Sequence, residues 1–143
     1  MSVVREAMVS HPGHLEANAS AQAAGELLER PEVRAVYVTE ADRLVGVVTR
    51  KTLVREVVAA GRDPKTTPLG EIAEPPDSTI GPDVPLDEAF RFLEEHDAER
   101  VPVVDGDGRL IGVLSRSVLQ RRLAEDEGPP PEDDEPPDLP TAA

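Results

Sequence analysis

The stretch DRLVGVVTRKTL, residues 42–53, returns in nearly the same letters as GRLIGVLSRSVL, residues 108–119. The two stretches lie 66 positions apart, and the same offset matches further residues on both sides without a gap. The matched pairs include Ala7/Ala73, Ala23/Ala89, Leu27/Leu93, Val38/Val104, Gly46/Gly112 and Arg50/Arg116. A period of this length is that of a whole supersecondary unit rather than one turn of a solenoid. The chain is therefore predicted to hold two copies of one unit.

Each copy has the pattern of a helix, a β-hairpin and a second helix. In the second copy, apolar residues at the spacing of an amphipathic helix follow Pro85, and residues 100–115 form a hairpin pattern around DGDG. In the first copy, Ala23, Leu27 and Leu28 mark the first helix, and Gly61 is expected to cap the second. A short strand is expected before each first helix, at residues 14–17 and 79–81.

The predicted fold class is α+β, with two pseudo-symmetric β-α-β-β-α repeats packed sheet to sheet as one module. Neither copy is large enough to bury a stable core alone, so the apolar faces of the two sheets are expected to cover each other. A cleft would then lie between the copies. The expected divisions are a first repeat (1–61), a linker (62–68), a second repeat (69–124) and a disordered acidic tail (125–143).

Composition limits the possible functions of this 143-residue chain. The net charge is −14, and the proline-rich stretch from residue 125 to 143 carries eight acids and no base. Such a segment buries too little apolar surface to offset its ordering entropy. An acidic chain with only three aromatic residues is unsuited to nucleic acid. With no long apolar run and no signal-peptide pattern at its start, the chain is expected in the cytoplasm and not in a membrane.

The pattern of strand, helix, strand, strand and helix, with VPVVD (101–105) followed by a Gly-apolar-apolar-Ser/Thr segment, resembles the cystathionine-β-synthase (CBS) domain. The resemblance covers about residues 3–124, and two copies in tandem are similar to a CBS pair, or Bateman module. It implies a flat module that forms a homodimer, binds an adenine nucleotide (AMP, ADP or ATP) in the cleft, and regulates a separate effector protein.

The candidate ligand site combines physical reasoning with this resemblance. Thr49 and Ser115 each end a strand and begin a helix, where free amides and the helix dipole favour a phosphate group. Arg50 and Arg116 follow directly and could add charged hydrogen bonds. The candidate ligand-binding residues are Thr49, Arg50, Thr52, His14, Ser115, Arg116, Thr79 and Ile80.

The chain departs from the family's nucleotide-binding pattern at one position of each copy. Where the family has an aspartate that holds the ribose, this chain has Thr52 and Val118. Thr52 can still make a neutral hydrogen bond and Val118 cannot, so the site of residues 46–52 is favoured. His14 matches Ile80 at the constant offset, and in this family that strand position tends to line the cleft.

No catalytic or metal site is predicted. His11, His14 and Glu16 lack the spacing of a strong metal site, and the chain has no cysteine. We find no nucleophile elbow, no P-loop and no acid–base pair with distinct environments, so an enzyme is not expected. Two functions stay open: a regulatory module that senses an adenine nucleotide, and a ligand-independent dimerisation or interaction module with degenerate sites.

Overall fold

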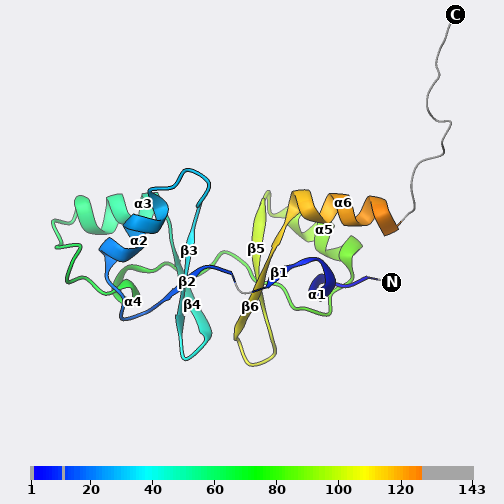
Figure 1. Cartoon of the computed structure of the whole chain (residues 1–143), viewed down its shortest axis with the longest axis horizontal. Coiled ribbons are helices and arrows are strands. Elements are labelled where there is room, and N and C mark those ends of the chain that lie inside the picture. Colours follow the sequence, from blue (N-terminus) through cyan, green and yellow to red (C-terminus); the bar gives the residue numbers. More distant parts are fainter. Residues whose placement is uncertain (1, 11, 127–143) are drawn as a thin grey trace, which may run out of the picture.

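A computed structural model describes residues 2–10 and 12–126, so most of the predicted tail lies outside the described residues. Two three-stranded sheets face each other at the centre of the molecule, and helices cover their outer sides (Figure 1). The first half consists of β2 (His14–Glu16), α2 (Ala21–Leu28), β3 (Val36–Glu40), β4 (Arg43–Val48), α3 (Arg50–Leu53), η1 (Val54–Val58) and α4 (Leu69–Ile72). The second half consists of α1 (Val4–Ala7), β1 (Val9–Ser10), α5 (Leu86–Glu95), β5 (Arg100–Val104), β6 (Leu110–Ser115) and α6 (Arg116–Asp126). The predicted α+β class and the pairing of two sheets are confirmed.

The two copies exchange their leading segments. Val4 of α1 is buried in the core of the second half, and β1 pairs with β6 there. In return, Leu69 and Ile72 of α4 are buried in the core of the first half. Each core therefore contains a segment from the other copy. The repeat pattern alone gives no sign of this exchange.

The pairing register corrects the constant offset of 66. Val38 pairs with Gly46, and Val103 pairs with Gly112, so positions 38 and 103 are equivalent although they are only 65 apart. The turn explains the difference, because four residues separate the paired Thr39 and Leu44 whereas five separate the corresponding pair in the second copy. The offset is 65 before this turn and 66 after it.

Several residue matches change as a result. The buried Ala24 and Leu28 of α2, and not Ala23 and Leu27, correspond to the buried residues of α5. In the leading segments, Ile72 and not Ala73 is equivalent to Ala7. The matches beyond the turn, from residue 43 onward, keep the offset of 66.

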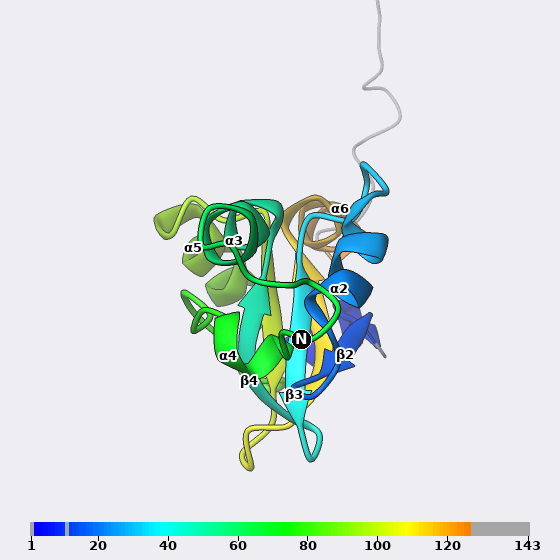
Figure 2. The same cartoon turned by 90° about the vertical axis from the view of Figure 1, so that its left-hand side faces the viewer.

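The tips of the two hairpins are joined across a pseudo-two-fold axis. The Leu44 N–H donates to the Gly108 carbonyl, and the Leu110 N–H donates to the Asp42 carbonyl, each at 3.0 Å. These two bonds are symmetry mates, because the offset of 66 relates the two donors, Leu44 and Leu110, and also the two acceptors, Asp42 and Gly108. The axis runs through the hairpin tips, and α3 and α6 lie at the opposite side of the molecule (Figure 2).

Where the exchanged segments cross the hairpins, a glycine lets the backbones approach. A Cβ placed on Gly46 would lie 2.6 Å from the Cβ of Ala73 and 3.0 Å from the Glu74 carbonyl oxygen. A Cβ on Gly112 would meet Met8 at 2.5 Å. A larger residue at either position would push the exchanged segment away from its strand.

The expected short strands and second helices differ between the copies. β2 forms a strand parallel to β3, but in the second copy Ile80 makes only an isolated bridge to Val103. The second helix of the first copy begins as α3 and continues as the π-helix η1, whereas α6 is a regular α-helix. Gly61 lies just beyond the end of η1 with a φ of +73°, and its N–H donates to the Val58 carbonyl oxygen, as expected for a glycine that closes a helix.

Candidate functional site

The start of α3 is held by two threonine hydroxyl groups. The Thr52 N–H donates to Thr49 Oγ1 at 3.3 Å, and the Thr49 N–H donates to Thr52 Oγ1 at 3.1 Å. The two hydroxyl oxygens are also 3.1 Å apart. In this capping box, each threonine hydroxyl accepts a hydrogen bond from the backbone N–H of the other threonine. Thr52 is only 1% exposed, so the structure places its hydroxyl inside the cap.

The Arg50 side chain extends toward the end of the preceding helix. Its Nη2 donates a 2.7 Å hydrogen bond to the Arg30 carbonyl oxygen, just beyond α2. A cation at this place also interacts favourably with the negative end of the helix dipole. Arg50 thus links the start of α3 to the end of α2. A bound phosphate would compete with this contact for the guanidinium group.

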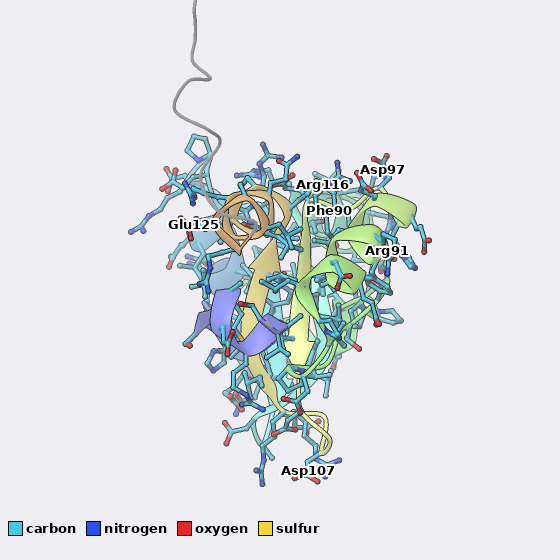
Figure 3. The ribbon with its side chains drawn as sticks, turned by 90° about the vertical axis from the view of Figure 1, so that its right-hand side faces the viewer. Phe90, Arg91, Asp97, Asp107, Arg116 and Glu125 are labelled. Atoms are coloured by element: carbon cyan, nitrogen blue, oxygen red, sulfur yellow. The ribbon has the colours of Figure 1, made fainter. Side chains whose placement is uncertain are left out.

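The second junction is built in a related way from Ser115 and Arg116. Ser115 Oγ accepts a 3.3 Å hydrogen bond from the Val118 N–H, which caps α6. Arg116 Nη2 donates to the Leu93 carbonyl oxygen at 3.2 Å, and Figure 3 shows Arg116 beside α5 and α6. Its Nε is buried without a hydrogen-bond partner. The Arg116 N–H is also taken, because it donates to the Glu99 carbonyl oxygen at 2.7 Å.

The strand residues of the expected site fall in different places. Thr79 and Ile80 line a cavity of about 610 Å³ between the segment 79–85 and the end of β5. His14 is exposed, and its Nδ1 lies 3.1 Å from the Pro12 carbonyl oxygen. Because Leu15 pairs with the strand as Ile80 does, Leu15 is the true equivalent of Ile80, and His14 corresponds to Thr79. The candidate residues thus lie in separate groups at α3, at α6 and around this cavity, and His14 lies outside all three.

Tyr37 is a residue of the sheet interface that sequence reasoning missed. It lies on β3 and is 9% exposed. Burial raises the pKa of the Tyr37 phenol above its ordinary value, and the Arg100 guanidinium from the other half offsets part of that increase. Tyr37 is the single tyrosine of the chain, and this is the feature of the sequence that could have drawn attention to it.

Two carboxylates near the strands have local partners. Glu16 accepts a 2.8 Å hydrogen bond from the buried Thr39 hydroxyl. In the turn between β5 and β6, the Arg109 N–H donates to the Asp105 carboxylate. This bond is the main cause of a lowered Asp105 pKa. In the described part of the chain, no group of three or more His, Cys, Asp or Glu side chains is arranged to hold a metal ion.

The comparisons with known proteins agree with this architecture. The family model of the CBS domain matches residues 4–59 and 69–125. Hypoxic response protein 1 of Mycobacterium tuberculosis is 34% identical over 84 residues, which is 59% of this chain and 58% of that protein. The CBS domain-containing protein YhcV of Bacillus subtilis is 28% identical, and the match covers 80% of this chain and 81% of that protein. The chain spans about half the length of the first curated relatives it matches.

Two solved structures are similar in both fold and sequence. Hypoxic Response Protein I, solved with two coordinated zinc ions, has a TM-score of 0.72 at 27% identity. The match covers 85% of this chain and 99% of that chain. CBSX2, solved in complex with AMP, has a TM-score of 0.71 at 26% identity and covers 89% of this chain and 99% of its own. Among the helices within residues 2–10 and 12–126, none has the length and apolar character needed to span a membrane.

Proposed function

Since the chain belongs to the CBS-domain family, we propose that its two CBS domains form a regulatory module that binds an adenine nucleotide between the copies and acts on a separate effector protein. The observation that carries the proposal is the hydroxyl-capped strand-to-helix junction, which occurs once in each copy at Thr49 and Ser115. AMP, bound by the related CBSX2, is the first ligand to test. The cytoplasmic location stays a prediction from the sequence.

The junction at Thr49 is the better phosphate site of the two. The first amides of a helix have no acceptor within that helix, and Thr49 Oγ1 accepts only from Thr52. The amides of Arg50 and Lys51 are therefore the ones that would face an anion. At the second junction the Arg116 amide already donates to Glu99, which removes one donor from such a site.

The same geometry predicts that nucleotide binding is weak. The Thr52 hydroxyl is used in the capping box, and the guanidinium groups of Arg50 and Arg116 donate to helix carbonyls. A nucleotide would have to compete for each of these groups. Because these groups already have hydrogen-bond partners within the protein, they favour a second candidate function, in which the module dimerises or binds a partner without a ligand.

Titration calorimetry with AMP and ATP tests the first function. Thr52→Asp should tighten binding about tenfold or more, because hydrogen bonds to a charged acceptor are worth roughly 1.5–3 kcal/mol. An aspartate can also keep the acceptor that the Thr49 N–H needs. Thr52→Val is the matched control without the charge, and Val118→Asp makes the same change in the other copy. Thr49→Ala should weaken binding.

Three outcomes separate the alternatives. Tight binding that neither Thr49→Ala nor Thr52→Asp changes would place the nucleotide elsewhere. Failure of every variant to bind AMP or ATP, with the fold intact, would favour the ligand-independent function. Tightening by Val118→Asp but not by Thr52→Asp would move the site to the second junction.

The proposed function includes a homodimer formed through the exposed helices. The hexameric CBS-CP12 protein of bloom-forming cyanobacteria, 26% identical with a TM-score of 0.61, shows that a related protein assembles. Light scattering at micromolar concentration tests this part. A mass of one chain would contradict it.

A further inference from the structure

A groove of about 570 Å³ lies between α2 and the helix formed by α3 and η1. Its lining includes Leu53 and Val57, and Gly25 of α2 adds no side chain to it. Two large apolar residues of the same helix are exposed, with Val58 at 73% and Val54 at 58%. An apolar surface of this kind on a soluble chain commonly marks a contact with another protein.

The second half carries a large side chain where the first half carries none. Because Ala24 and Ala89 are equivalent buried positions, the next residues, Gly25 and Phe90, are also equivalent. Figure 3 shows Phe90 on α5, beside α6. Phe90 is only partly buried against its own core. One half thus presents a groove, and the other half presents a phenylalanine at the matching place.

The pseudo-two-fold axis puts both features on the same side of the molecule. Helices α2, α3, α5 and α6 all lie toward the side opposite the hairpin tips (Figures 1 and 2). A second copy can meet this helical side with like halves together or with unlike halves together. The halves have the same hairpins and the same order of helices, although η1 is a π-helix where α6 is regular, so the features that differ at this face decide between the two arrangements.

We propose that two copies pair head to tail, with Phe90 of each copy seated in the Gly25 groove of the other. Like halves together would oppose two grooves at one end and two phenylalanines at the other. Unlike halves fill both grooves at once, and a closed two-fold dimer makes both contacts identical. This inference rests on the proposed homodimer and adds its orientation.

Charge favours the same arrangement. Glu26 borders the groove, and its equivalent in the second half is the exposed Arg91 of α5 (Figure 3). Head-to-tail pairing brings these opposite charges to the same end of the dimer. Pairing of like halves would gather two Glu26 side chains at one end and two Arg91 side chains at the other.

The orientation can be measured with spin labels, because the chain has no cysteine of its own. Lys65→Cys labels an exposed loop after η1, and Glu125→Cys labels the far end of α6 (Figure 1). Head-to-tail pairing predicts a long distance between labels within each single-variant dimer. A mixture of the two variants should add a short Lys65→Cys to Glu125→Cys distance. A short distance between two Lys65→Cys labels would overturn the orientation while the homodimer stands.

The contact itself is tested by exchanging the groove and the phenylalanine. A Cβ at Gly25 would be 3.7 Å from Leu53 Cδ1, an ordinary contact, so the fold accepts a Cβ there. Phe90→Ala should raise the dimer dissociation constant about tenfold or more, as for a central interface residue. Gly25→Phe should dissociate the dimer, whereas the double variant Gly25→Phe/Phe90→Gly should restore it. Gly25→Ala is the small control and should stay dimeric.

Each outcome has one meaning. A dimer that tolerates Gly25→Phe as well as the natural chain would overturn the inference, since the filled groove could not receive Phe90. A monomer for the natural chain in light scattering would overturn the homodimer and this inference together. Circular dichroism of each variant confirms that a loss of dimer is not a loss of fold.

Discussion

The first half begins its second helix with two interlocked hydroxyls, at Thr49 and Thr52, whereas the second half uses a single serine and places Val118 where the other has Thr52. The first half also has the shorter hairpin turn and an open groove at Gly25, where the second half has Phe90. The strand pairing is nearly the same in both. The hairpin ladders are thus alike in the two halves, whereas the outer strand, the second helix and the side chains that cap it have diverged.

The largest expected effect compares the two crossing glycines. Gly46→Ala should lower the free energy of unfolding by about 2–3 kcal/mol, in the range of overpacked sites, because the new Cβ meets Ala73 and the backbone of Glu74. Gly112→Ala should cost a similar amount: the Met8 side chain can move, but the added Cβ would also lie 2.9 Å from the Val9 carbonyl oxygen. Urea unfolding measures both, and Gly81→Ala is the control because nothing lies within 4 Å of its added Cβ.

Second-site changes sharpen this comparison. Adding Ala73→Gly to Gly46→Ala should recover part of the lost stability, because it removes the 2.6 Å contact between the two Cβ atoms. Equal and negligible costs at Gly46 and Gly112 would show that the exchanged segments do not press on the hairpins in solution.

A smaller effect separates the two helix starts. Thr52→Val removes the hydroxyl that accepts from the Thr49 N–H in a buried place, and should cost about 1–2 kcal/mol of stability. Val118→Thr makes the reverse change at the partly exposed equivalent position and should stay within about 0.5 kcal/mol. Thermal and urea unfolding give both values. Similar costs for the two changes would contradict the assignment of the capping box to the first half alone.

The smallest effect is on the titration of Tyr37, whose equivalent in the second half is Pro102. The raised pKa means that folding favours the neutral phenol, so this stability is present below the ordinary pKa of 10.0 and is lost as pH rises through the folded value. Arg100→Gln should raise the Tyr37 pKa further, because it removes the opposing cation of the other half.

Ultraviolet absorbance of the phenolate measures this titration cleanly, because the chain has one tyrosine and no tryptophan. Tyr37→Phe is the control and should remove both the absorbance change and its share of the alkaline destabilisation. An unchanged Tyr37 titration in Arg100→Gln would mean that the two sheets do not bring these side chains together.

Much of the local structure was predictable from the sequence. The β-branched runs and turn residues predicted both hairpins, and apolar spacing predicted the helix that follows Pro85. The helix starts after Thr49 and Ser115 followed from their hydroxyl groups, and the end at Gly61 from its freedom to adopt a positive φ. These features depend on neighbouring residues, and a single sequence contains that information.

The offset between the copies was not predictable, and the reason is visible in α2. This helix contains the doublets Ala23–Ala24 and Leu27–Leu28, so an offset of 65 or 66 matches alanine with alanine and leucine with leucine. Only the hydrogen-bond register across the hairpins decides between them. The same one-residue error paired His14, rather than Leu15, with Ile80.

The sequence by itself determined two copies, their hairpins and the capped helix starts, because periodicity and capping act over a few residues. Only the tertiary structure decided that the leading segments exchange and that the Thr52 hydroxyl is enclosed. It also decided that Gly25 and Phe90 occupy equivalent positions in the two halves. Each of these depends on contacts between residues far apart in the chain. Such contacts form where burial of apolar surface and pairing of backbone groups are satisfied together, and no short-range pattern records that balance.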